Sequence, residues 1–399
     1  WNFKKRQFMK HLTISLAIIL LSAARLLPQN IEVIIAEVEN NNPALIALRK
    51  SAEAERIGNK TGLSLSNPEL EFSYLWGSPQ TIGKRNDLSI MQSFDFPAAY
   101  AYRNQISEYR NVQVELELEK HRREILLQVR QLCNMLVYHN VMRAELETRA
   151  ENARRIADSW EAKYRAGEAG IIDYNKSRIN LLNTERDAES NEIEREALLA
   201  ELVSLNGGKP IDLTDTVYPL LPIPSEFEEW YAGAEQNSPL LQWLKQEVSV
   251  SLKNEQLSVA LGLPRIQAGY MSETVVGEQY RGVSLGIAIP LLENRNAVKY
   301  ARAKTIAVQS AEADARNRFY NNLKALHTKT VSLQNNLNEY REKLSVYNSS
   351  ALLMKALDLG EISLTEYIYE LTFFYESINR LHDMEKELNE TVTELISYR

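Results

Sequence analysis

Two hydrophobic periods alternate along the chain. In the long stretches, apolar residues recur at alternating steps of three and four positions, and a few polar residues share the series. The first series is Ile125, Val129, Leu132, Leu136, His139, Arg143 and Leu146, and the second is Leu323, Leu326, Thr330, Leu333, Leu337, Tyr340, Leu344 and Tyr347. This spacing is typical of a coiled-coil seam, and it predicts long helices.

Short stretches between the helical ones alternate apolar with small or polar residues, a period of two that predicts β-strands. Together the patterns predict a mainly α-helical chain with a small β part: long coiled-coil hairpins plus four strands. We expect strands at Leu70–Trp76, Leu88–Phe94, Ile266–Met271 and Val283–Ile289. We expect helices at Ile31–Leu65, Ala99–Arg165, Ile171–Leu205, Ser225–Leu261, Asn296–Asp358 and Ser363–Tyr398.

The order of these elements repeats once. Pro43 and Pro239 occupy equivalent places, as do Asn67-Pro68 and Leu263-Pro264, and each pair is separated by 196 positions. The segment Gly167 to Tyr174 returns 193 positions later as Gly360 to Tyr367. Three matches in register indicate a tandem repeat. We therefore divide the chain into a first structural repeat (31–206), a linker rich in Pro and Gly (207–224) and a second structural repeat (225–399).

The strands have the length and alternation of membrane-crossing strands, which need about 9–11 residues when tilted. The candidate residues of the membrane strands are Phe72, Tyr74, Trp76, Ile90, Tyr270, Leu285 and Ile287, and Tyr74, Trp76 and Tyr270 could form part of an aromatic belt at the membrane interface. An ordinary half-buried hairpin is the alternative. Four strands cannot close into a barrel, and known membrane barrels have about eight strands or more. The membrane interpretation therefore requires an oligomer, and three chains would give twelve strands, although the pattern itself does not choose three.

Composition narrows the class of protein. Only 15 Gly and 12 Pro occur in 399 residues, which agrees with long uninterrupted elements. The single Cys133 excludes a disulfide scaffold. A mean hydropathy of −0.34 excludes a protein with many membrane-spanning helices, and a pI of about 5.6 argues against nucleic acid as a partner.

The first 24 residues have the features of a secretory signal peptide, preceded by a short extension. Basic residues at Lys4, Lys5, Arg6 and Lys10 are followed by the apolar run Leu12 to Leu21 and by Ser22-Ala23-Ala24. A single membrane anchor is the alternative, but it needs about 20 apolar residues. We expect the chain to be exported.

Taken together, these features resemble the TolC-like outer-membrane efflux channel family, also called outer membrane factors. The resemblance rests on the two tandem copies, on Asn67-Pro68-Glu69-Leu70 before the first strand, and on the Gly-Glu-x-x-x-x-acid-Tyr turns; the full-length fit looks most like the heavy-metal and multidrug branch. It implies a homotrimer with a 12-stranded β-barrel in outer-membrane lipid and a 12-helix α-barrel through the periplasm. It also implies a periplasmic adaptor (membrane fusion) protein and an inner-membrane efflux pump as partners, or a type I secretion system.

The resemblance also implies a gate at the periplasmic end, closed in family members by acidic rings after the turn of the second repeat. Glu366 occupies the first gate position, Tyr369 stands where a second acid is common, and Asp173 is the equivalent in the first repeat. Both carboxylates are also suited to a helix N-terminus, which is the alternative role. The turns themselves are candidate adaptor contacts, with Gly167, Glu168, Gly360 and Glu361 at their centres.

Catalytic and cofactor chemistry is not expected. The five histidines form no HExxH motif or paired metal spacing, and there is no phosphate-binding glycine loop. Two other classes of protein are alternatives, a periplasmic adaptor and a purely structural coiled coil. A periplasmic adaptor should carry a Gly-rich β domain inside its helical hairpin, and a purely structural coiled coil does not require four strands in two matched repeats. An enzyme is the remotest interpretation.

Overall fold

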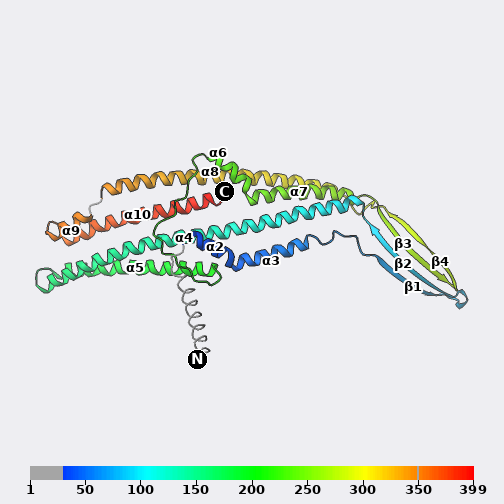
Figure 1. Cartoon of the computed structure of the whole chain (residues 1–399), viewed down its shortest axis with the longest axis horizontal. Coiled ribbons are helices and arrows are strands. Elements are labelled where there is room, and N and C mark those ends of the chain that lie inside the picture. The colour runs from blue at the N-terminus through cyan, green and yellow to red at the C-terminus, as the bar shows by residue number, and fades with distance from the viewer. Residues whose placement is uncertain (1–29, 348–349) are drawn as a thin grey trace, which may run out of the picture. The chain divides into compact units, whose positions relative to one another are not determined.

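The computed structural model describes residues 30–347 and 350–399, so the expected signal peptide lies outside the described residues. The fold is mainly α-helical with one small sheet, as predicted (Figure 1). Its helices are α2 (Ile31–Asn41), α3 (Pro43–Gly58), α4 (Pro97–Arg165), α5 (Ile171–Leu205), α6 (Phe227–Asn237), α7 (Pro239–Ala260), α8 (Ala297–Val346), α9 (Ser350–Asp358) and α10 (Leu364–Ile396). The strands are β1 (Glu69–Trp76), β2 (Lys84–Phe94), β3 (Arg265–Val275) and β4 (Glu278–Ala288), and the short 3₁₀ helix η1 (Gln80–Ile82) follows β1.

The first helix of each repeat differs from the prediction because a proline divides it. Asn42 and Ser238 have extended backbones with ψ of 119° and 114°, as expected for residues that precede proline. Pro43 and Pro239 then begin α3 and α7, where the missing N–H is not needed. Ser238 caps α7 by accepting a hydrogen bond from the Leu241 N–H. The interruption therefore occurs at equivalent places in both repeats.

The described residues form two compact units, each containing segments of both repeats. The first unit comprises residues up to 44 together with 123–225 and 325–397, and the second comprises 45–122, 226–324 and 398–399. Helices α4 and α8 contribute to both units. The sheet belongs to the second unit, and the turns α4–α5 and α9–α10 belong to the first.

The predicted seam on α4 forms part of the core of the first unit. Val129 and Leu136 are completely buried against residues of α2 and α5, including Ile34 and Leu202. The linker covers this cluster: Asn140 donates hydrogen bonds to the backbone oxygens of Leu213 and Asp215, at 2.9 and 3.0 Å. A second cluster contains Ile156 of α4 and Leu364, Tyr367 and Leu371 of α10.

The sheet is a single antiparallel layer with the order β1-β2-β3-β4 (Figure 1). Its central pair, β2 and β3, joins the two repeats, with Ile90 opposite Tyr270. Three strands are 11 residues long, because the ladders continue beyond the predicted segments through polar residues toward the turns. Strands β1 and β4 are the sheet edges, so each chain leaves one side of both strands without a backbone partner in this sheet.

Candidate functional site

The sheet has two faces of opposite character. The register places Leu70, Ile90, Tyr270 and Val283 in one row across all four strands. Since successive strand residues point to opposite faces, this row fixes the face on which every other strand residue lies. We call it the apolar face; its apolar members are Leu70, Phe72, Tyr74, Trp76, Leu88, Ile90, Phe94, Ile266, Ala268, Tyr270, Val283, Leu285 and Ile287. All seven candidate residues of the membrane strands lie on it.

Except for Phe94 and Ala268, which are half-buried, these apolar side chains are exposed in the single chain. Trp76, Val283 and Leu285 are 77%, 86% and 81% exposed. A fully buried side chain of this kind is stabilised by about 2 kcal/mol, so leaving the set in water forgoes on the order of 20 kcal/mol per chain. An exposed apolar surface of this extent marks an interaction with another protein or a membrane.

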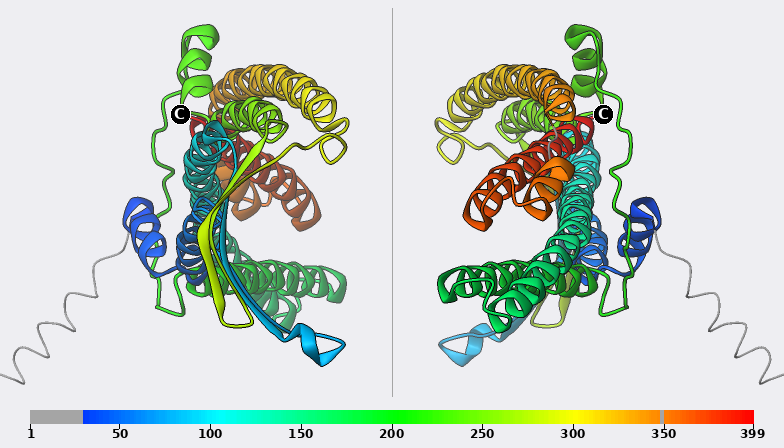
Figure 2. Two further views of the ribbon diagram at one scale, coloured as in Figure 1. Left: turned by 90° about the vertical axis from the view of Figure 1, so that its right-hand side faces the viewer. Right: turned by 90° about the vertical axis from the view of Figure 1, so that its left-hand side faces the viewer.

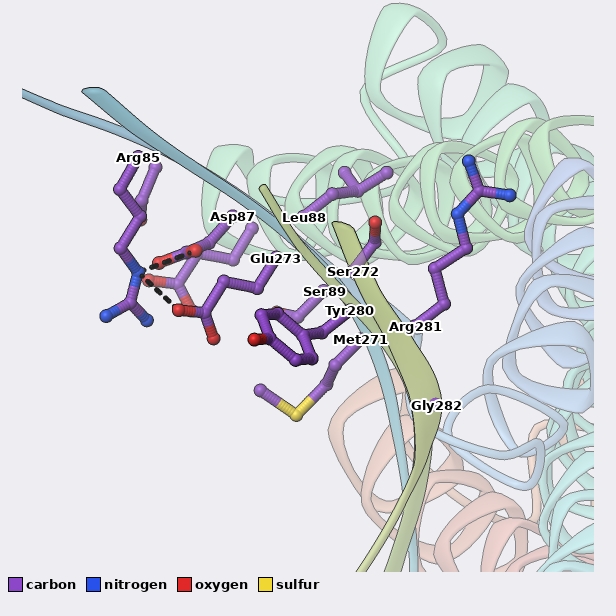
Figure 3. Close-up of a pocket in the computed structure, with 12 residues that line it drawn as sticks. Arg85, Asp87, Leu88, Ser89, Met271, Ser272, Glu273, Tyr280, Arg281 and Gly282 are labelled. Carbon is purple, nitrogen blue, oxygen red and sulfur yellow. Dashed lines mark hydrogen bonds and ion pairs between the residues drawn. The ribbon is translucent and has the colours of Figure 1, made fainter. Parts of the chain in front are cut away.

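The opposite, polar face carries the carboxylates of the strands. Glu69, Glu71, Asp87, Glu273 and Glu278 lie there with Arg85 and Arg265, a net charge of −3 per chain. The Nε atom of Arg85 lies 2.9 Å from Asp87 and 3.2 Å from Glu273. Figure 3 shows these three side chains together on one side of the strands and Arg281 extending from the other. The sheet therefore separates a charged, hydrated surface from an apolar one.

The α4–α5 and α9–α10 turns share one backbone geometry. Gly167 and Gly360 have φ of 78° and 71°, the left-handed conformation that ends a helix. The N–H of Glu168 bonds to the Lys163 carbonyl at 2.8 Å, and the N–H of Glu361 bonds to that of Ala356 at 2.9 Å. The predicted adaptor-contact residues thus form two equivalent Schellman turns, which appear in Figure 2 as the green and orange hairpin ends.

Glu366 lies at the third position of α10 and completes a capping box with Ser363. The Ser363 N–H donates to the Glu366 carboxylate at 2.8 Å, and the Glu366 N–H donates to the Ser363 hydroxyl at 3.2 Å. The bond from the Ser363 backbone holds the pKa of Glu366 below its usual value. In the single chain the carboxylate therefore has the helix-terminus role that the sequence offered as an alternative.

The other two gate candidates lie in different settings. Asp173 is in the first turn of α5, where the cap residue is Gly170 and no capping side chain is present. Tyr369 is 71% exposed and lines a groove of about 520 Å³ between α5 and α10, together with Phe373 and Ile179. The structure thus places Tyr369 beside α5 and Glu366 at its own helix end.

A contact between the two hairpins was not predicted. Lys176 of α5 donates a hydrogen bond to the Thr365 hydroxyl of α10 at 2.8 Å. Tyr367, which the repeat makes equivalent to Tyr174, is buried between α10 and α4, whereas Tyr174 stacks on Tyr164 at 5.2 Å. Repeat matching singles out both tyrosines, but it contains no information on which residues meet between repeats.

The described residues hold no cluster of three or more His, Cys, Asp or Glu side chains placed to bind a metal ion.

Among the described helices, none is both long enough and apolar enough to cross a membrane.

Comparison with known proteins decides which fold this is. No protein-family model and no curated protein sequence matches the chain. Solved structures do match, and three of them illustrate the likeness. They are the CmeC outer membrane channel of Campylobacter jejuni (TM-score 0.76, 13% identity, 93% of this chain and 85% of that one), the outer-membrane channel OprN (0.76, 12%, 92% and 89%), and the outer membrane protein VceC of Vibrio cholerae (0.72, 11%, 92% and 94%). The chain has the outer-membrane channel fold.

The outer-membrane channel fold includes both the four-stranded sheet and the long helices of this chain. The match to CmeC extends over 93% of the chain, so the sheet and the helices belong to one fold. At 13% identity the likeness lies in the backbone. The chemistry of the sheet faces and hairpin turns must therefore be taken from this chain's own residues.

Proposed function

We propose that this chain is one subunit of a trimeric outer-membrane channel that serves as a passive exit duct. The observation that carries the proposal is the division of the sheet into an apolar face and a charged face. Each chain would supply four strands to a 12-stranded barrel, with the apolar face toward lipid and the polar face toward the water-filled lumen. The likeness to outer-membrane channels supports the same location.

The free edges of the sheet support closure between copies. Strands β1 and β4 run in opposite directions, so β4 of one chain can pair with β1 of the next in an antiparallel ladder. An unpaired strand edge in hydrocarbon costs several kcal/mol for each unsatisfied group. Closure by neighbouring copies removes that cost, and twelve strands are within the known range for membrane barrels.

The helical hairpins would continue the duct through the periplasm. We assign the turns at Gly167-Glu168 and Gly360-Glu361 to contact with a periplasmic adaptor protein, which would connect the duct to an inner-membrane efflux pump or to a type I secretion system. Glu366, Asp173 and Tyr369 would line the periplasmic entrance. Three copies of Glu366 near the axis would attract cations and repel one another, so closure would depend on pH and salt.

Two measurements on the purified full chain test this function. We expect the chain to fractionate with outer membranes and to migrate as a trimer that resists SDS, since its strand edges pair between copies. We also expect discrete conductance steps in planar bilayers. A soluble monomer without conductance would contradict the channel and would favour a periplasmic adaptor or a structural coiled coil.

A further inference from the structure

The charges of the sheet are divided between its faces by sign. Among the strand residues, all of which the structure describes, the apolar face carries two charged side chains, Lys84 and Arg281, and both are basic. All five carboxylates of the strands lie on the polar face, as described above. A charged side chain in contact with hydrocarbon alone is unfavourable, so the two cations on this face indicate an anionic partner.

Each cation lies on the turn side of the apolar residues of its own strand. The two are in different rows of the register: Lys84 is in the row of Trp76, and Arg281 is in the row of Phe72, four residues away along the strands. Lys84 is the first residue of β2 and pairs with Trp76, the last residue of β1. Arg281 is near the start of β4, opposite Ser272, and the next residue of β4 on this face, Val283, begins its apolar series. The strands of a membrane barrel tilt by about 35–45°, so a row of the register is inclined to the membrane and residues in different rows can reach the same boundary between hydrocarbon and headgroups, where aromatic residues also gather.

The local contacts leave both cations available to an anion. The Lys84 Nζ atom lies 5.8 Å from the centre of the Tyr74 ring, and the Tyr74 and Trp76 rings are 6.3 Å apart. Arg281 donates to the side-chain oxygen of Gln279. Neither cation forms an ion pair with a carboxylate of the described residues, whereas Arg85, adjacent to Lys84 but on the polar face, is paired with both Asp87 and Glu273.

We propose that Lys84 and Arg281 bind the phosphate groups of membrane lipids at the turn end of the barrel. This proposal rests on the proposed function. Lys84 is on β2 and Arg281 on β4, so closure of three copies would place a cation on every second strand around the barrel. The result is a ring of six basic side chains just beyond the hydrocarbon.

Charge and position together select the occupant of this ring. An arginine can hold a phosphate through two parallel hydrogen bonds, and a lysine beside aromatic rings supplies a point charge at the same level. The outer leaflet of outer membranes contains lipid A, whose sugars carry phosphate groups. We therefore assign this ring to lipid A phosphates.

Lipid binding to the purified full-chain trimer in detergent tests the assignment. Native mass spectrometry would compare diphosphorylated lipid A with the same lipid after removal of its phosphates. We expect the wild-type trimer to prefer the phosphorylated lipid and the Lys84→Gln/Arg281→Gln variant to bind it at least roughly tenfold more weakly. Arg85→Gln removes a charge from the next residue on the polar face and should leave binding unchanged.

Two further outcomes make the test decisive. The charge-conserving Lys84→Arg/Arg281→Lys variant should bind phosphorylated lipid within about threefold of wild type. If the double Gln variant does not assemble, the comparison of the two lipids on the wild-type trimer remains the test. Equal binding of both lipids by a wild-type trimer that conducts ions would overturn the lipid site and leave the channel intact. A chain that neither assembles nor conducts would overturn the proposed function itself.

Discussion

Lys176 of α5 and Thr365 of α10 are joined by a hydrogen bond of 2.8 Å between Nζ and Oγ1. The bond connects the second turn of α5 to the first turn of α10, and the two helices come from different repeats. It lies beside the two hairpin turns and next to the groove lined by Tyr369 and Phe373. If the periplasmic entrance opens by separation of the two hairpins, this bond must break.

Removal of that bond should favour the open entrance. We expect Thr365→Val and Lys176→Met each to raise the open probability in planar bilayers about fivefold, which corresponds to the loss of one hydrogen bond of about 1 kcal/mol. Lys163→Met is the matched control, because the Lys163 amine lies 4.8 Å from the Trp160 ring of its own helix and bridges no hairpins. Equal open probabilities for wild type and both variants would show that the bond does not hold the entrance closed.

Variants of the capping box separate the two roles of Glu366. Glu366→Gln keeps an acceptor for the Ser363 N–H but removes the charge, and Ser363→Ala removes the cap but keeps the carboxylate. We expect block of the conductance by divalent cations to weaken in Glu366→Gln and to persist in Ser363→Ala. Unchanged block in Glu366→Gln would leave Glu366 as a helix cap alone.

The same carboxylate predicts a pH dependence of the helix end. The pKa of Glu366 is lowered in the folded chain, so its stabilising effect is complete above the unfolded value near 4.5 and is lost as pH falls through the lower folded value. The protection of the first turn of α10 from hydrogen exchange, measured relative to the intrinsic exchange rate at each pH, should therefore decrease in wild type below about pH 4.5. In Glu366→Gln this decrease should be absent.

Charge on the polar face should make the channel selective for cations. The net charge of this face is −3 per chain, and a charged lumen concentrates ions of the opposite sign. We expect the triple variant Glu71→Gln/Asp87→Asn/Glu273→Gln to shift the reversal potential in a KCl gradient toward zero. Lys84→Gln, on the other face, should leave the reversal potential as it is, and a similar shift in both variants would contradict the assignment of the faces.

Adjacent residues of β4 should respond in opposite ways to a charge. Leu285 lies on the apolar face and Ser284 on the polar face. Leu285→Arg should destabilise the assembled barrel by about 2–4 kcal/mol, the cost of a lipid-facing arginine near the middle of a membrane. Ser284→Arg should be tolerated within about 1 kcal/mol, as measured by denaturant unfolding of trimers in lipid vesicles.

The sequence predicted the elements better than their contacts. Helix α4 ends and helix α5 begins where expected, because Gly167 adopts the left-handed conformation that stops α4 and Gly170 precedes α5, and such signals are local. The helix breaks at Pro43 and Pro239 were not predicted, although both prolines are evident in the sequence. A proline is compatible with the first position of a helix, so its presence alone does not show where one helix ends and the next begins. The alternation along the strands identified both faces of the sheet before the register was known.

Contacts between repeats depend on tertiary packing. The bond from Lys176 to Thr365 spans 189 positions, and burial of Tyr367 against α4 depends on how two hairpins meet. The capping role of Glu366 was visible in the Ser-x-x-Glu spacing, since both partners lie within one turn. Local signals therefore located the candidate residues, while long-range packing determined their neighbours.

The central claim is that alternate residues of β4 face lipid and water in the assembled membrane channel. Spin labels attached to single cysteines along β4 test it directly, because oxygen concentrates in lipid and a nickel chelate stays in water. The native Cys133 will not compete for the label, since burial raises the pKa of its thiol to about 12. An added side chain at Gly282 on the polar face meets no atom within 4 Å, and Val283, Leu285 and Ile287 on the apolar face are exposed in the single chain, so labels can be placed on both faces.

Accessibility measured in lipid vesicles should alternate with a period of two. We predict high oxygen and low nickel accessibility at Val283, Leu285 and Ile287, and the reverse at Gly282, Ser284 and Gly286. Uniform nickel accessibility along β4, or an alternation with the opposite phase, would contradict the membrane barrel.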